Sequence, residues 1–164
     1  MQRPRWFVLL AGFATLVAVP AADSSAAEIG FFGWGLRGGI SSDPDQAVVG
    51  VHFDLGEFAD RVLFRPNADF GFGDDETVIT ANAAVHWLPA QTWDKWQPYV
   101  GGEIGLNHRD IDRDHGRDKN ETDLALNAVG GVDRVRPGGA KLSFEIKIGL
   151  AEEPDLKLLV GWTF

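Results

Sequence analysis

Residues 141–150 have the sequence KLSFEIKIGL, in which apolar residues alternate with polar or small ones at every step. In an extended chain, one side carries Leu142, Phe144, Ile146, Ile148 and Leu150, and the other carries Ser143, Glu145, Lys147 and Gly149. Successive side chains of a β-strand point to opposite faces of the sheet. This period of two therefore predicts a strand with one apolar and one polar face.

The same alternation recurs along the rest of the chain, and no stretch shows sustained helical periodicity. We expect eight strands, each with about the 9–11 residues that a tilted strand needs to cross a bilayer. They are Phe32–Ile40, Ala47–Leu55, Val62–Phe72, Val78–Trp87, Pro98–Asn107, Asp123–Asp133, Lys141–Leu150 and Leu156–Phe164. The segments between them are rich in Gly, Pro, Asp and other polar residues, which favour turns. Short links join antiparallel neighbours, so the pattern predicts an up-and-down meander.

The two faces of these strands differ sharply in composition. The face that contains Leu36, Val51 and Ile104 has no charged residue in any of the eight strands, whereas the opposite face is polar and rich in glycine. An eight-stranded barrel has an interior just wide enough for its own side chains. The bulky apolar face, with its tryptophans and phenylalanines, does not fit there and belongs outside. The fold class predicted is an all-β, eight-stranded antiparallel transmembrane β-barrel. The alternative is a soluble, lipocalin-like barrel with the faces exchanged.

The N-terminal segment has the features of an export signal. Met1–Arg5 carries two arginines, Trp6–Val19 is an uncharged apolar run of 14 residues, and small residues follow through Ala27. This order is typical of a cleaved signal peptide. A membrane-spanning helix needs about 20 apolar residues, so the run is too short for an anchor. We predict a signal peptide at residues 1–27 and a barrel domain at residues 28–164.

Charge and cysteine content restrict the partners. Without residues 1–27, which carry Arg3, Arg5 and Asp23, the 15 basic and 24 acidic residues of the chain fall to 13 and 23. This acidic balance argues against nucleic acid as a partner. The sequence contains no cysteine, so an exported domain of this size is not stabilised by disulfides.

Charges of both signs fall on the predicted inward face in near balance. An unpaired charge in such an interior costs several kcal/mol. We therefore predict a network of salt bridges across the lumen, centred on Arg37, Arg65, Glu103, Glu145 and Lys147.

Aromatic residues are expected at the two rims of the barrel, where lipid meets water. If both termini lie on the same side, one rim carries Phe32, Trp34, Phe53, Phe64, Trp87, Trp162 and Phe164. Trp93 and Trp96 fall in the adjacent turn, and Phe70 and Phe72 mark the other rim. A soluble protein that exposed such a band would aggregate.

With these features, residues 32–164 resemble the small outer-membrane β-barrel proteins of the OmpA transmembrane-domain, OmpX and OmpW type. The resemblance includes the alternating C-terminal strand that ends on an aromatic residue, with Val160, Trp162 and Phe164. It implies that these residues are an assembly signal for the barrel-insertion machinery, and that the protein is located in a bacterial outer membrane. It implies partners among outer-membrane lipids and lipopolysaccharide. The fold itself hosts many functions, so it does not specify one.

A metal site is considered in the segment His108–Thr122, which is predicted to be the longest loop. Positions 1, 3, 5, 9 and 12 of an EF-hand-like spacing are occupied by Asp110, Asp112, Asp114, Asp118 and Glu121. The glycine of this loop, Gly116, falls at position seven instead of six, strands flank the loop, and three basic residues offset the carboxylates. We favour a solvated, charge-mixed loop, with a calcium site as the alternative.

Three classes of function are weighed. A lipid-modifying hydrolase would need Ser, His and a carboxylate in contact, but Ser143 is predicted to point inward beside Glu145, away from lipid. A wide diffusion pore is not expected, because eight strands leave a lumen filled by side chains. We favour a monomeric structural or surface-interaction barrel with no cofactor and no catalytic residues. A narrow channel or small-solute transporter is the first alternative, and a lipid-A-modifying enzyme is the second.

Overall fold

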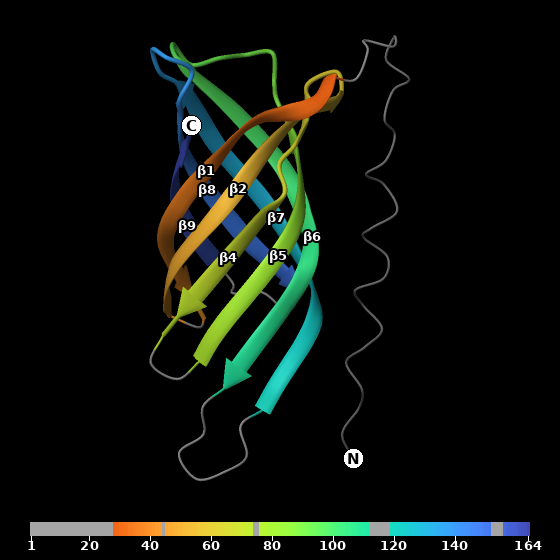
Figure 1. Ribbon diagram of the computed structural model, residues 1–164, viewed down its shortest axis with the longest axis vertical. Helices are drawn as coiled ribbons and strands as arrows, with labels where there is room; N and C mark the ends of the chain where they lie inside the picture. Colours follow the sequence, from red (N-terminus) through yellow and green to blue (C-terminus); the bar gives the residue numbers. More distant parts are fainter. Residues whose placement is uncertain (1–27, 44, 74–75, 112–118, 152–155) are drawn as a thin grey trace, which may run out of the picture.

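The computed structural model describes residues 28–43, 45–73, 76–111, 119–151 and 156–164, and these form a β-barrel (Figure 1). The predicted signal peptide lies outside the described residues. Among the described residues there is no helix long and apolar enough to cross a membrane. The strands are β1 (Glu28–Ser42), β2 (Gln46–Ala59), β3 (Val62–Phe64), β4 (Asn67–Phe72), β5 (Glu76–Trp87), β6 (Trp96–Ile111), β7 (Lys119–Val135), β8 (Lys141–Ala151) and β9 (Leu156–Thr163).

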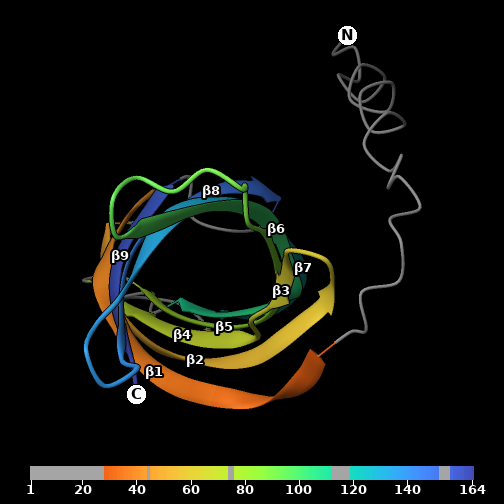
Figure 2. The ribbon, with the colours of Figure 1, turned by 90° about the horizontal axis from the view of Figure 1, so that it is seen from above.

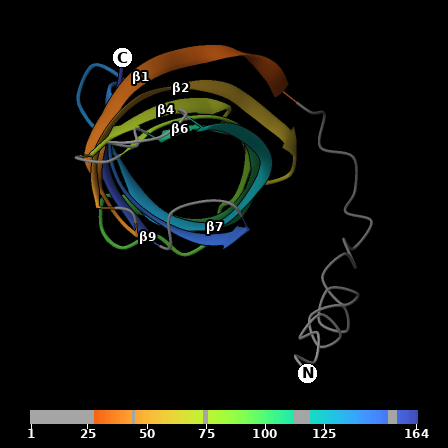
Figure 3. The same ribbon diagram turned by 90° about the horizontal axis from the view of Figure 1, so that it is seen from below.

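The barrel is closed by the pairing of its first and last strands. Apart from β3 and β4, strands that follow one another in the sequence pair antiparallel, and β1 pairs with β9 from Gly35–Thr163 to Ser42–Leu156. Viewed along its axis from either end, the sheet forms a continuous ring (Figures 2 and 3). β3 and β4 occupy the place of one strand between β2 and β5. The predicted closed, eight-stranded, all-β barrel is therefore confirmed.

The predicted strand at residues 62–72 is interrupted at Arg65 and Pro66. Proline has no backbone N–H, so it removes one hydrogen bond from the ladder. The remaining groups at this position stay paired: the N–H of Phe53 donates to Pro66 O at 3.0 Å, and the N–H of Arg65 donates to Ala84 O at 2.9 Å. The interruption is local, and the barrel wall continues across it.

Several strands are longer than predicted, above all β6 and β7. The prediction of one loop from His108 to Thr122 is wrong at both ends, because the two strands stay paired as far as Ile111 and Lys119. Backbone hydrogen bonds hold this hairpin regardless of its polar side chains, so alternation of hydrophobicity alone underestimates its length. The hairpin extends beyond the neighbouring strands (Figure 1).

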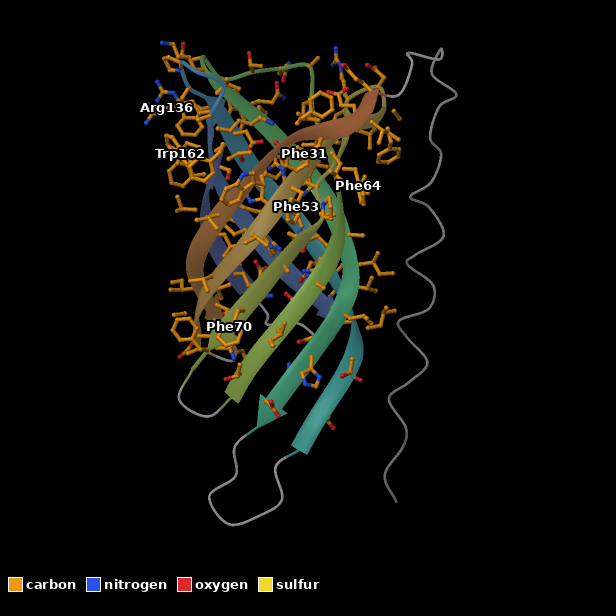
Figure 4. All side chains as sticks on the ribbon, in the orientation of Figure 1. Phe31, Phe53, Phe64, Phe70, Arg136 and Trp162 are labelled. Carbon is orange, nitrogen blue, oxygen red and sulfur yellow. The ribbon has the colours of Figure 1, made fainter. Side chains whose placement is uncertain are left out.

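The two ends of the barrel are named here by the residues that lie there. The terminal end contains Glu28 and Phe164, and the loop end contains Ser42, Phe72 and Ile111 (Figure 1). Phe31, Phe53, Phe64 and Trp162 lie toward the terminal end, and Phe70 lies at the loop end (Figure 4). Phe70 and Phe72 have ring centroids 6.0 Å apart, so aromatic side chains lie toward both ends of the barrel, as they do at an interface between lipid and water.

The wall has an apolar outside and a polar inside. Outward side chains such as Ile40, Val100 and Ile148 are at least half exposed. The buried side chains are mostly polar or charged, in contrast to a soluble domain. They include Arg37, His52, Asp54, Arg65, Asn67, Asp69, Asn82, His86, Glu103, Asn127, Asp133, Glu145, Lys147 and Lys157.

Adjacent glycines on β7 show how differently the two faces are packed. A Cβ atom built on Gly131, which faces inward, would lie 2.5 Å from Phe144 O and from the Tyr99 ring. A Cβ atom built on Gly130, which faces outward, has no heavy atom within 4 Å. The lumen is full at this level, whereas the outer wall is hollow.

This contrast predicts opposite effects of the same small substitution. Gly131→Ala is expected to lower the free energy of unfolding by about 1–3 kcal/mol, because the overpacked methyl group must displace backbone. Gly130→Ala is expected to leave it unchanged or to raise it slightly. Urea unfolding in detergent micelles, followed by tryptophan fluorescence, measures both. Equal loss in the two variants would contradict the packing described.

Candidate functional site in the barrel lumen

The middle of the lumen contains a cluster of ion pairs, called here the mid-lumen cluster: Arg37 from β1, Asn67 and Asp69 from β4, Glu103 from β6, and Glu145 and Lys147 from β8. Arg37 forms a bidentate pair with Asp69, in which Nε and Nη2 each donate to one carboxylate oxygen at 2.6 Å. Its Nη1 also donates to Glu145 at 3.2 Å. Paired N–H groups match a carboxylate in both charge and geometry, which makes such contacts strong.

Lys147 is the most enclosed cation of this cluster. Its side chain is completely buried, and Nζ donates to Glu103 Oε2 at 2.9 Å and to Asp69 Oδ2 at 3.3 Å. Glu145 lies 3.8 Å away. Asn67 joins the two cations, because its Oδ1 accepts from both Arg37 and Lys147. The cluster therefore links strands on opposite sides of the barrel.

A second group, called here the terminal-end cluster, consists of Asp54, Arg65, Asp133 and Lys141. Arg65 donates to Asp54 Oδ1 through Nε at 2.6 Å and to Asp133 Oδ2 through Nη2 at 2.6 Å. The partly exposed Lys141 donates to Asp54 Oδ2 at 2.5 Å. Each carboxylate here has a cationic partner, so the cluster is electrically balanced.

Tyr99 lies between the two clusters. Its hydroxyl group donates to Glu145 Oε2 at 2.8 Å, and the Arg65 guanidinium lies 5.5 Å from its ring centroid. The His86 ring stacks on it with a centroid separation of 4.6 Å. The tyrosine therefore connects the polar groups of both levels through one hydrogen bond and two ring contacts.

Two hollows that border these clusters are very small. The hollow between Arg37, His52 and Ser143 has a volume of about 10 Å³, and the one beside Asp69 and Lys157 has essentially none. A cavity needs roughly 10–15 Å³ to hold a single water molecule. A larger hollow of about 460 Å³ opens at the terminal end, between Phe32, Glu57 and Leu63. The lumen therefore has a vestibule at the terminal end and a packed middle.

The five residues predicted to form the network all lie in the lumen, but in two groups. Arg37, Glu103, Glu145 and Lys147 belong to the mid-lumen cluster, and Arg65 belongs to the terminal-end cluster. The sequence placed Asp54, Asp69 and Asp133 on the inward face but not at the predicted centre of the network, although Asp69 is the bidentate partner of Arg37 and the other two pair with Arg65. Their inward position followed from the alternation. Their partners depend on which strands face each other across the lumen, which a sequence pattern does not reveal.

The calcium candidates are only partly within the described residues. Asp112, Asp114 and Asp118 lie outside them. Asp110 and Glu121 belong to β6 and β7, where Asp110 pairs with Asn120 and Arg109 pairs with Glu121. Paired residues share a face and successive residues alternate, so Asp110 and Glu121 point to opposite faces of the hairpin. The structure does not bring these two carboxylates together.

The inward Ser143 lies near His52 and Glu145, around the 10 Å³ hollow. A hydrogen bond joins His52 Nε2 and the Thr163 hydroxyl group, at 2.8 Å. A hydrolytic triad requires the histidine to contact the nucleophile and the substrate to reach it. The hollow is too small to admit a lipid, so this arrangement does not support hydrolysis there.

The residues predicted to be the assembly signal lie on the outside of β9. Val160, Trp162 and Phe164 are all exposed to the surroundings of the barrel. Phe164 donates through its N–H to Trp34 O at 2.8 Å, and the two rings lie 5.0 Å apart. Phe164 therefore contributes to the closing contact with β1.

The enclosed position of Lys147 leads to a prediction about stability. Lys147→Met preserves much of the side-chain volume but leaves Glu103 without its cation, and we expect it to lower the free energy of unfolding by about 3–5 kcal/mol. Adding Glu103→Gln should restore part of the loss. Lys141→Met is the matched control, with an expected cost of about 1 kcal/mol or less, because Lys141 is partly exposed and Asp54 keeps Arg65. Urea titration of the refolded barrel tests this ranking, and equal losses would contradict it.

Comparison with known proteins shows the fold. Neither a known protein-family profile nor a curated protein sequence matches the chain. Neisserial surface protein A (NspA) superposes with a TM-score of 0.56 and 15% identity, over 80% of this chain and 92% of that protein. The N-terminal β-barrel domain of Pseudomonas aeruginosa OprF gives a TM-score of 0.51 and 17% identity, over 82% of this chain and 99% of that domain. The de novo designed protein TMB2.3 superposes with a TM-score of 0.50 and 11% identity, over 85% of this chain and 96% of that protein. The chain thus has a fold similar to that of small eight-stranded outer-membrane barrels.

Proposed function

We propose that this protein is a barrel of the bacterial outer membrane with a structural or surface-interaction role and no catalytic activity. The observation that carries the proposal is the arrangement of its two faces. Exposed aliphatic side chains such as Leu36, Ile104 and Ile146 cover the outside, and ion pairs fill the inside. Only a hydrocarbon environment makes such an exterior favourable.

The packed lumen favours a structural role over transport. Arg37 and Lys147 cross-link β1, β4, β6 and β8 at the centre of the barrel. Among the residues that the structure describes, the buried cations of the lumen, together with Lys141, are matched by an equal number of buried carboxylates: Arg37, Arg65, Lys141, Lys147 and Lys157 against Asp54, Asp69, Glu103, Asp133 and Glu145. A neutral, filled interior does not attract ions of either sign.

The β6–β7 hairpin supports the surface-interaction role. Along the described residues, β7 starts at Lys119, but its pairing with β8 starts only at Leu126. The intervening backbone forms an edge without a neighbouring strand in the described part of the chain. Such an edge is able to bind an extended peptide by strand addition. This segment carries Lys119 as well as Glu121 and Asp123.

Export and assembly complete the proposal. Residues 1–27 are removed as a signal peptide, and Val160, Trp162 and Phe164 are recognised by the barrel-insertion machinery. The mature protein is a monomer that belongs with the barrels of the OmpA transmembrane-domain, OmpX and OmpW type. The loop end faces the cell exterior and lipopolysaccharide, and the terminal end faces the periplasm.

The location is tested by membrane fractionation combined with heat modifiability. We expect the full-length protein, expressed in a Gram-negative host, to enter the outer-membrane fraction. Without boiling it should migrate faster in detergent gels than after boiling, because the closed barrel stays compact. A soluble periplasmic protein with no such shift would contradict the proposal and favour the lipocalin-like alternative.

The channel alternative is tested by conductance. We expect planar bilayers that contain the purified barrel to show no stable conductance steps, since the mid-lumen cluster leaves no space for a hydrated ion. An unrelated open porin, reconstituted in the same way, serves as the positive control. Stable conductance steps above the baseline would contradict the proposed structural role and favour a narrow channel.

A further inference from the structure

The outer wall has a hollow near the terminal end that the proposed function does not use. It has a volume of about 560 Å³ and extends across β6 to β9, with Val100, Val132, Phe144, Leu158 and Trp93 among its lining residues. Gly130 lies within it and leaves open space where a side chain would be. This volume falls within the roughly 300–1,000 Å³ of small-ligand pockets. The outward side chains that line the hollow are apolar.

Two arginines lie directly beyond this hollow on the terminal side. One row of paired residues, Pro98, Val132, Phe144 and Val160, lines the hollow, and the next row is Trp96, Arg134, Leu142 and Trp162. The Arg134 guanidinium lies 5.4 Å from the Trp96 ring centroid, and that of Arg136 lies 6.0 Å from the Trp162 ring. Figure 4 shows Arg136 beside Trp162 at this rim.

These arginines differ from those of the lumen in their partners. Within the described part of the chain, neither Arg134 nor Arg136 forms an ion pair; each lies against an indole ring. Stacking orders the planar guanidinium and leaves its N–H edge available, and that edge matches a phosphate group. Two such cations on an acidic chain are complementary to an anionic headgroup.

We propose that this hollow and its two arginines form a binding site for an anionic glycerophospholipid. An acyl chain fills the space over Gly130, and the phosphate lies between Arg134 and Arg136. The inference rests on the proposed membrane location, which places the terminal end in the periplasmic leaflet. A phosphate-bearing lipid combines the two features observed, an apolar hollow and a basic rim separated by one row of residues.

The site can be tested by removing either half of it. Arg134→Gln combined with Arg136→Gln removes the charges, with Arg61→Gln, in the turn before β3 at the same end, as control. Gly130→Leu fills the hollow, and Ala81→Leu is its control, because Ala81 is an exposed, outward residue of β5, outside the strands that line the hollow. All proteins are refolded as the full barrel and checked for heat modifiability.

Lipid retention is measured by native mass spectrometry in detergent with equal amounts of phosphatidylglycerol and phosphatidylcholine. We expect the unmodified barrel to retain phosphatidylglycerol with a preference of about fivefold or more, as expected for arginine near an anionic lipid. The double arginine variant should lose this preference, and Gly130→Leu should lose retention of both lipids. Arg61→Gln and Ala81→Leu should behave like the unmodified barrel.

The outcomes separate this inference from the proposed function. A heat-modifiable barrel that retains both lipids equally, prefers lipid A, or carries a second protein copy in place of lipid would overturn the lipid site and leave the outer-membrane role intact. Retention unchanged by both the charge and the hollow-filling variants would overturn the site as well. A protein that shows no heat modifiability would instead overturn the membrane location.

Discussion

The pairing of β1 with β9 is the constraint on which the rest of the structure depends. In hydrocarbon, each unpaired backbone N–H or C=O group costs several kcal/mol, so a sheet there has no free edge along its length. The ladder from Gly35–Thr163 to Ser42–Leu156 removes that edge, and the N–H of Phe164 extends it to Trp34 O. Closure of eight strands then sets the lumen to a width that its own side chains fill.

This narrow lumen explains why the inward residues are either small or paired. Gly131 is required where the Tyr99 ring packs over β7 to reach Glu145, and charged residues are tolerated where a partner reaches them from another strand. The ion pairs also specify register. A shift of one residue in a strand sends every inward side chain outward. A slip of β1 by one residue would move Arg37 to the outer face and leave Asp69 without its bidentate partner. The unpaired charges would raise the free energy of the misregistered barrel by several kcal/mol, so the mid-lumen cluster favours the correct register.

The alternation of residues was sufficient to predict the class of fold, the number of strands and the face of each side chain. The prediction failed where the alternation of apolar and polar residues does not coincide with the backbone hydrogen bonds between strands. The extension of β6 to Ile111 has polar residues on both faces, and the break at Pro66 lies within an otherwise regular pattern. The pairing of the charged residues in the lumen could not be predicted from the alternation either. Arg37 and Asp69 belong to strands that are not neighbours, and their contact depends on the tilt and stagger of the whole barrel. The hollow over Gly130 was not predicted, because the alternation of apolar residues does not show where a glycine leaves open space on the outer wall.

The distribution of paired and unpaired charge indicates where this barrel is able to recognise other molecules. In the lumen, carboxylates such as Glu103 and Asp133 form ion pairs with cations of the same chain, so their charge is neutralised within the folded barrel. Arg134 and Arg136 differ, since each is held by an aromatic ring that orders the side chain without neutralising it. Binding of an external anion requires a cation whose charge is still available. For this reason, the specificity of the barrel is expected on its outer wall and at its protruding hairpin, while the lumen contributes the stability that holds both in place.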